Sequence, residues 1–150
     1  MKILVFSDSH GMFSTMKEIA DREQPDLIFH LGDHEYDCDH AFPDLKVVKV
    51  RGNCDLGSHE EKERFIDFGS SKIWMTHGHL YGVKNGLSSL LKQGEAYGAD
   101  LILYGHTHRR YLYKTDRYTV LNPGTPDESY GVIEMEYGHI LSVELKTTNL

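Results

Sequence analysis

Five short apolar runs constrain the fold of this chain more than any other feature of its 150 residues. Each is four to six residues long, the length of a buried strand, and polar residues follow or end each one. The runs are KILVFS (2–7), LIFHL (27–31), VVKV (47–50), KIWMTH (72–77) and LILY (101–104). Apolar residues at helical spacing over 12–23 separate the first two, so the chain opens with a β-α-β unit, which predicts a right-handed crossover and a parallel sheet.

The rest of the chain predicts one further helix and several strands. Apolar residues from Val83 to Tyr97 mark a helix that closes near Gly98, and ERFIDF (63–68) forms a hairpin with the run at 72–77. After residue 104, YLYK, YTVLN, YGVIEMEY and HILSVELK predict strands joined by short turns, a β meander. No linker or repeat divides the chain, so we expect one domain over residues 1–150, of the α/β class, with a mixed or two-sheet architecture.

The charge and cysteine content limit the partners and the location. The chain has 16 Lys and Arg against 23 Asp and Glu, a net charge of −7 with neutral histidines. This balance disfavours extended nucleic acid but leaves small anionic substrates open, because bound cations can reverse the local charge. No segment predicts a membrane helix, and the N-terminal run predicts a first strand rather than a signal peptide. Cys38 and Cys54 are isolated, which argues against a structural zinc site and favours a reducing, cytoplasmic location.

Potential metal ligands gather where the apolar runs end. They are Asp8, His10, Asp33, Asn53, Asp55, His77, His79, His106 and His108. A single Asp or Asn in such a place is more often a turn or cap residue, and a single His is usually solvated. Because ligands bind outside the carboxyl ends of strands in open α/β sheets, five such strand ends together predict one site. A mixture of two carboxylates, one amide oxygen and four or five imidazoles suits Mn, Fe or Zn better than Mg or Ca, and seven ligands from this set suit two sites that share a carboxylate.

The same segments resemble the motifs of a known family. DSH (8–10), GD (32–33), GNCD (52–55), THGH (76–79) and GHTH (105–108) follow the order and rough spacing of the calcineurin-like metallophosphoesterases. The chain is most similar to their small single-domain phosphodiesterase branch, which includes a retromer subunit with the same fold. The resemblance implies two mixed β-sheets packed face to face with helices on the outside, a four-layer α/β/β/α sandwich.

The resemblance also implies a site with two divalent metal ions. Asp8, His10 and His108 would hold one metal, Asn53, His77 and His106 the other, and Asp33 would bridge them. We expect manganese first, with Fe, Ni or Zn as alternatives. Such a site would hydrolyse a small phosphate ester, most simply a phosphodiester, by in-line attack of a hydroxide that bridges the metals.

One position departs from the larger relatives, which carry GNH, with a His thought to protonate the leaving group. Here the residue is Cys54, and a neutral thiol is a poor substitute for imidazolium near pH 7. We therefore expect good leaving groups to be favoured, or His79 or Asp55 to help, and we expect Cys54 to be a small, half-buried packing residue. The predicted catalytic residues are Asp33, Asn53, His79 and Asp55.

Two functions remain open at this point. The first is a dinuclear-metal phosphodiesterase or phosphatase, and the second is a non-catalytic protein-interaction scaffold, as in the retromer-like relatives with altered ligands. The chain keeps a competent residue at every ligand position, which favours catalysis. Arg51, Arg109 and Arg110 could hold phosphate or face solvent. The aromatic and apolar residues of the C-terminal strands could pack a homodimer or a higher homo-oligomer.

Overall fold

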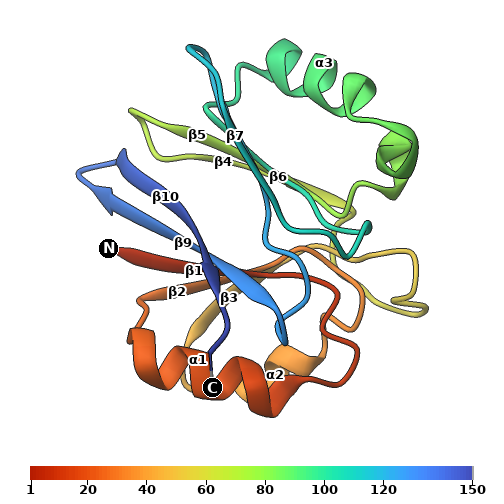
Figure 1. Cartoon of the computed structure of the whole chain (residues 1–150), viewed down its shortest axis with the longest axis vertical. Coiled ribbons are helices and arrows are strands. Elements are labelled where there is room, and N and C mark those ends of the chain that lie inside the picture. Colours follow the sequence, from red (N-terminus) through yellow and green to blue (C-terminus); the bar gives the residue numbers. More distant parts are fainter. Residues whose placement is uncertain (150) are drawn as a thin grey trace.

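Two five-stranded sheets packed face to face form the centre of the protein (Figure 1). The structure is a computed structural model and describes residues 1–149. The first sheet has the order β10-β9-β1-β2-β3 and the second has the order β4-β5-β6-β8-β7. Helices α1 (Phe13–Glu23) and α2 (Asp37–Ala41) cover the first sheet, and α3 (Ser88–Tyr97) covers the second. The predicted four-layer sandwich of two mixed sheets is therefore confirmed.

The strands match the predicted apolar runs closely. In the first sheet they are β1 (Lys2–Phe6), β2 (Leu27–His30), β3 (Lys46–Lys49), β9 (Ser129–Glu136) and β10 (His139–Thr147). In the second they are β4 (Glu63–Asp67), β5 (Lys72–Thr76), β6 (Leu101–Leu103), β7 (Tyr111–Lys114) and β8 (Thr119–Asn122). β1, β2 and β3 are parallel, and β4 and β5 form the predicted antiparallel hairpin.

The second long helix begins later than its apolar pattern predicts. Val83 lies in a short 3-10 turn (Val83–Asn85), and α3 starts only at Ser88. Gly82 and Gly86, with φ values of 60° and 128°, bound this turn in conformations that a regular helix does not contain. The apolar spacing correctly predicted which residues face the sheet but could not show the break.

The prediction of a C-terminal β meander is wrong. β7 and β8 pair as a hairpin, but β8 then lies parallel to β6, and the chain crosses to the first sheet. There β9 pairs antiparallel with both β1 and β10. The reason is burial: Tyr130 and Val132 pack with the α1 side, whereas Ile133 and Met135 pack between the sheets. A strand buried on both faces needs a central place that a meander at the edge of a sheet does not provide.

Alternation along each central strand divides the core into three layers. On β1, Ile3 and Val5 face the space between the sheets, whereas Leu4 and Phe6 face α1. Trp74 packs with residues of α3 and β6 in the outer layer of the second sheet. Both faces of the central strands are therefore covered, which explains why their sequences are continuous apolar runs rather than alternating ones.

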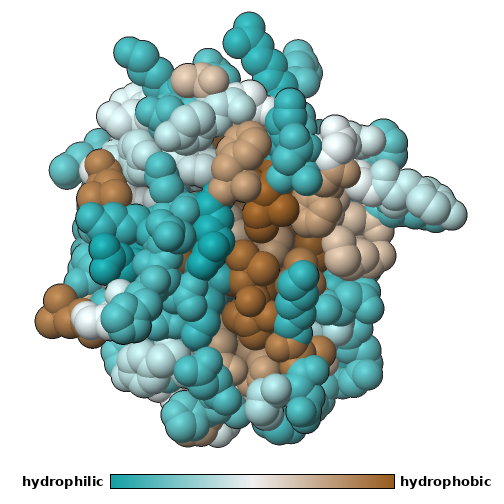
Figure 2. Space-filling model, turned by 180° about the vertical axis from the view of Figure 1, so that it is seen from behind, coloured by the Kyte–Doolittle hydropathy of each residue, from teal (hydrophilic) through white to brown (hydrophobic). Residues whose placement is uncertain are grey.

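The side of the molecule opposite to that in Figure 1 carries an apolar strip between hydrophilic flanks (Figure 2). At the rim of the core between the sheets, Val48 of β3 and Ile66 of β4 are only partly buried, and both belong to strands at the ends of their sheets. Within residues 1–149, no helix has the length and the apolar character needed to cross a membrane.

Candidate metal centre

The loops that carry the predicted ligands follow β1, β2, β3, β5 and β6, at the carboxyl ends of these strands. They converge at the right-hand side of the two sheets in Figure 1, where the sheets approach each other. Two groups of potential metal ligands form there, one with Asp8, His10, Asp33 and His108, the other with Asp33, His77 and His106. Within each group, one ligand atom per residue lies within 4.8 Å of all the others.

The first group is half open to solvent. Asp8 and Asp33 are buried, whereas His10 and His108 are exposed. His108 Nε2 lies 3.3 Å from Asp8 Oδ1, and the ring centroids of His10 and His108 are 5.3 Å apart. An ion held here would therefore rest on two buried carboxylates and remain accessible from the histidine side.

The second group is more enclosed and shares Asp33 with the first. His77 is fully buried, and its Nε2 lies 3.4 Å from Asp33 Oδ2 and 3.2 Å from His106 Nδ1. His77 Nδ1 lies 2.8 Å from the Leu31 carbonyl oxygen, so Nδ1–H is the donor there and Nε2 is directed at the carboxylates. Histidines that bind metals in proteins are commonly oriented by such a bond on the other ring nitrogen.

The two carboxylate oxygens of Asp8 differ in their hydrogen bonding, and the difference indicates that the site fits a cation. Asp8 Oδ2 accepts hydrogen bonds from Ser7 Oγ (2.5 Å) and from the His106 amide (3.0 Å). Asp8 Oδ1 is buried and accepts no hydrogen bond from any described residue. An unpaired buried oxygen of this kind costs free energy, and a divalent ion coordinated by the mixed N and O donors would satisfy it.

The titration of the central pair reflects the same crowding of charge. Burial acts to raise the pKa of Asp33, but hydrogen bonds from His77 and from the Cys54 amide outweigh it and hold that pKa well below its usual range. Burial likewise acts to lower the pKa of His77, and the carboxylates of Asp33 and Asp8 overcome it and raise that pKa. Protons and metal ions therefore compete for this pair, because a ligand must be deprotonated to coordinate.

Backbone strain is concentrated at the same loops. Among residues 1–149, eight non-glycine residues have positive φ. Six of them belong to these loops, with φ between 41° and 71°: Asp8, His10, Asp33, His34, His106 and His108. Each such conformation costs on the order of 1 kcal/mol and persists only where the surroundings enforce it. The strain aims the four predicted ligands of the first group toward one point.

Close backbone contact fixes the two loops around Asp33. A Cβ atom on Gly32 would lie 2.6 Å from the Gly52 nitrogen, and one on Gly52 would lie 2.6 Å from the Asp33 nitrogen. Any larger side chain at either position would push the GD and GNCD loops apart. Glycine at these two positions therefore allows the two loops to pack closely against each other.

Asp55 holds these loops together through four backbone hydrogen bonds. Its buried carboxylate accepts them from the N–H groups of Asp33 (2.8 Å), His34 (2.7 Å), Glu35 (3.2 Å) and Gly52 (2.7 Å). Both carboxylate oxygens are therefore occupied by backbone donors, and Asp55 positions Asp33; its help to a leaving group stays a prediction.

A second buried network, which the sequence did not predict, positions the loop that carries His10. Ser9 Oγ donates to Asp37 Oδ2 (2.7 Å) and lies 2.9 Å from His30 Nε2, and Asp37 Oδ2 also accepts the Gly11 N–H (2.8 Å). His30 is a fully buried packing residue with both ring nitrogens hydrogen-bonded, since its Nδ1 accepts the Gly32 N–H, and burial lowers its pKa to about 3. The Ser of DSH was the available signal, whereas nothing in the local pattern marks Asp37.

The GNCD loop leaves two predicted residues exposed. Asn53 is exposed, and its side-chain amide contacts Cys54 Sγ at 3.6 Å rather than a member of either group. Cys54 is also exposed, so the prediction of a half-buried packing residue is wrong. Desolvation and the carboxylate of Asp33 raise the pKa of its thiol, which keeps it neutral. The loop turns outward here because its inward contacts are made by Gly52 and by the Cys54 amide.

His79 lies beside the second group. Its ring centroid is 5.5 Å from that of His77 and 6.1 Å from that of His106. Burial and the neighbouring His77 lower its pKa, and its buried Nδ1 has no hydrogen-bond partner among the described residues. It lines a cleft of about 190 Å³ together with Arg51, Asn53 and Lys62, so it can contact a ligand held at the second group.

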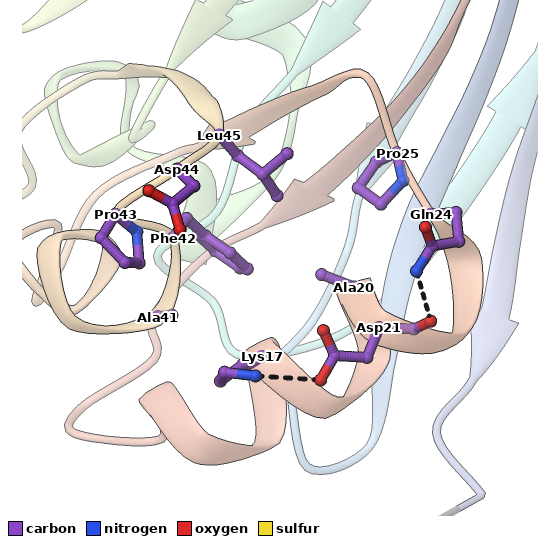
Figure 3. A pocket seen from close by; sticks show the side chains of 10 residues that line it. All are labelled: Lys17, Ala20, Asp21, Gln24, Pro25, Ala41, Phe42, Pro43, Asp44 and Leu45. Carbon is purple, nitrogen blue, oxygen red and sulfur yellow. Dashed lines mark hydrogen bonds and ion pairs between the residues drawn. The ribbon is translucent and has the colours of Figure 1, made fainter.

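Not every cavity belongs to this site. A groove of about 280 Å³ lies between α1 and the segment after α2 (Figure 3). Its lining includes Ala20 and Phe42, and Lys17 forms an ion pair with Asp21 at 3.0 Å there. None of the predicted metal ligands lines it. This groove is therefore separate from the two groups of potential metal ligands.

Known proteins share both the sequence and the fold. The profile of the calcineurin-like phosphoesterase superfamily domain matches residues 1–144. A probable metallophosphoesterase from Bacillus subtilis, YsnB, is 35% identical over 145 residues, covering 91% of this chain and 85% of that protein. A predicted phosphoesterase from Streptococcus pneumoniae has a similar structure (TM-score 0.78, 26% identity, 98% of this chain and 89% of that chain). A variant of Vps29 from Entamoeba histolytica covers 99% of this chain and 100% of its own with a TM-score of 0.79, but its 18% identity shows only a shared fold.

Proposed function

The chain belongs to the calcineurin-like phosphoesterase superfamily, and from this membership we propose that it is a phosphodiesterase whose site uses two divalent metal ions. The family supplies the coarser activity, metal-dependent hydrolysis of a phosphate ester. One observation carries the proposal: the carboxylate of Asp33 belongs to both groups of potential ligand atoms.

Seven residues share the coordination in this proposal. Asp8, His10 and His108 would hold one metal, Asn53, His77 and His106 would hold the other, and Asp33 would contribute to both. When bound, such metals would supply an acidified water and neutralise charge on the phosphate oxygens. The Leu31 carbonyl keeps His77 Nε2 directed at the site, and Asp55 keeps Asp33 in place through the backbone. Asn53 joins only if its exposed side chain turns inward.

His79 is the remaining candidate for contact with the leaving group. Asp55 is occupied by backbone donors, and the Cys54 thiol is neutral and exposed. The ring of His79 lies next to His77 and His106, so it can form a hydrogen bond to an ester oxygen bound there. With His79 in this place, an ester with an alkoxide leaving group is within the reach of the proposed site, and esters with good leaving groups should react fastest.

Further parts of the proposal concern the setting of the site. Manganese is the metal we propose first, with Fe, Ni or Zn as alternatives, because the donors combine imidazole nitrogens with carboxylate oxygens. We also propose that residues 1–150 form a single domain, that the protein acts in the cytoplasm on a small phosphate ester, and that it could associate as a homodimer or higher homo-oligomer.

A protein-interaction scaffold is the alternative function. The similarity to Vps29 supports it only at the level of the fold, since the identity is 18%. The unpaired Asp8 Oδ1 and the two convergent groups favour a metal-binding enzyme, because a scaffold gains nothing from buried ligands that lack partners.

The test is metal-dependent hydrolysis of bis(4-nitrophenyl) phosphate. The purified protein is stripped of metal, and Mn, Ni, Zn or Mg is added back. We expect activity to return with Mn and to be lost in His106→Ala, while His139→Ala, which removes an exposed histidine on β10, behaves like the parent. A parent that stays inactive with every metal, or a His106→Ala variant as active as the parent, would contradict the proposal.

A further inference from the structure

A cleft borders the GHTH loop, the loop that carries two of the potential metal ligands. Its volume is about 540 Å³, within the range of roughly 300–1,000 Å³ that is typical of small-molecule sites. The cleft is lined by residues of the turn before α3, by the loop itself and by the start of β7. No part of the proposed metal coordination uses it.

Thr107 connects this cleft to the proposed metal site. It lies between His106 and His108 in sequence, and it lines the cleft. Thr107 Oγ1 accepts hydrogen bonds from Asn122 Nδ2 (2.9 Å) and from the Arg109 amide (3.1 Å), which fix the residue in place. One short loop therefore presents two potential metal ligands and one wall of the cleft.

The cleft is cationic in an acidic protein. Lys84, Arg109 and Arg110 line it, and no Asp or Glu does. Within residues 1–149, none of these three cations forms an ion pair, and no carboxylate inside the cleft offsets their charge. Three uncompensated cations beside one cleft attract an anionic group, and guanidinium groups suit phosphate in particular.

The cleft also has an apolar and aromatic part. Tyr104 and Tyr111 line it together with Leu87, and Tyr111 is 40% exposed. A free phosphate would leave this surface and most of the volume unused. Cations beside an aromatic wall suit a ligand that carries both a phosphate and an aromatic ring in one molecule, as a nucleotide does.

We propose that this cleft binds one arm of the substrate, and that this arm is a nucleoside with a terminal phosphate. The inference rests on the proposed phosphodiesterase function, since it requires the scissile phosphate to lie at the metal ligands across the GHTH loop. The substrate class is then a short linear oligonucleotide, whose terminal phosphate contacts Lys84, Arg109 and Arg110 while its base packs on Tyr111. The small size of the cleft is consistent with the exclusion of long duplexes.

Kinetic selectivity tests the cleft. We expect the parent to hydrolyse an adenosine dinucleotide with a 5′-phosphate about tenfold better, in kcat/KM, than the same dinucleotide without it. The triple variant Lys84→Gln/Arg109→Gln/Arg110→Gln should lose this preference, whereas Lys114→Gln, at an exposed cation of β7 outside the cleft, should keep it. A parent without the preference, or a triple variant that retains it, overturns the inference while hydrolysis of bis(4-nitrophenyl) phosphate leaves the proposed function standing.

If the parent hydrolyses no diester with any metal, the proposed function fails. The proposed ligand of the cleft is then tested by binding of adenosine monophosphate alone. Calorimetry with adenosine monophosphate and the metal-stripped full chain reports on the cleft without the metal ligands. Binding that weakens about tenfold in the triple variant supports a nucleoside phosphate site. Tyr111→Ala should weaken adenosine monophosphate and leave ribose 5-phosphate unchanged. Absence of binding, or equal binding by parent and triple variant, contradicts the site.

Discussion

Two clusters of carboxylates show what the structure does with buried charge. Around Glu23, the carboxylate receives Tyr130 Oη (2.6 Å), Lys146 Nζ (3.1 Å) and Lys2 Nζ (3.3 Å), so the cluster joins α1 to β1, β9 and β10 with its charge satisfied internally. Around Asp33, two carboxylates and four histidines converge, and Asp8 Oδ1 accepts no hydrogen bond from the described residues, although His108 Nε2 lies 3.3 Å away. The first cluster stabilises the fold, whereas the second keeps its donors for an external cation.

Replacement of Asp33, the carboxylate shared by both groups of ligands, should have the largest effect on activity. Asp33→Asn keeps the shape of the side chain but weakens both groups of ligands, so we expect activity to fall by more than about 100-fold. The circular dichroism spectrum should stay that of the parent, because Asp55 and Gly52 still hold the loops. Asp44→Asn, at an exposed position, is the matched control and should keep full activity. An active Asp33→Asn variant would contradict the role of the second cluster.

Asp55 tests how far the ligand cluster depends on its supports. Asp55→Ala removes the acceptor of four backbone N–H groups, and we expect a loss of about 2–4 kcal/mol in the free energy of unfolding in urea. Manganese affinity should fall as well, since Asp33 is no longer held. If unfolding is unchanged while activity alone is lost, Asp55 acts in the chemistry and not in the loop.

Glu23 gives the corresponding test of the first cluster. Glu23→Gln should cost about 1–2 kcal/mol of stability at pH 7 and leave kcat/KM unchanged. Burial acts to raise the Glu23 pKa, but hydrogen bonds from Tyr130, Lys146 and Lys2 outweigh it and lower that pKa below 4.5. The contribution is therefore present above pH 4.5 and is lost as the pH falls through the lowered pKa. Thermal unfolding of Glu23→Gln should vary less with pH in that acidic range; a dependence as steep as that of the parent would refute the assignment.

Cys54 carries the smallest expected effect. The thiol is exposed and neutral, and the Cys54 backbone N–H already donates a hydrogen bond to Asp33 Oδ1 (2.9 Å). Cys54→Ser should change kcat by less than about threefold, far below the 100-fold or more that loss of a general acid causes. A loss of kcat of about 100-fold or more would indicate that the Cys54 thiol takes part in catalysis.

The strand ends were predictable because burial leaves a strong local signal. Continuous apolar runs identify strands covered on both faces, and the carboxyl ends of such strands meet, so Asp8, Asp33 and His77 could be expected together from the sequence. The left-handed conformations of His106 and His108 could not, because only the assembled loops enforce them.

The failures lie where long-range packing decides. The crossing of the chain from β8 to β9 depends on burial of both faces of β9, which short turns do not report. Asp55 was named as a possible aid to the leaving group because the Cys54 thiol is a poor acid, and the sequence did not show that four backbone N–H groups from two loops bind its carboxylate. Cys54 looked like a packing residue because free cysteines usually are, yet its loop turns it outward.

The number of manganese ions bound per chain tests the central claim most directly. Elemental analysis after equilibration with manganese and removal of free metal would give this number for the parent and for Asp33→Asn. Two ions per parent chain, and fewer in Asp33→Asn with Asp44→Asn unchanged, are the predicted result. One ion or none in the parent, or two ions retained by Asp33→Asn, would contradict a pair of metals joined by this carboxylate.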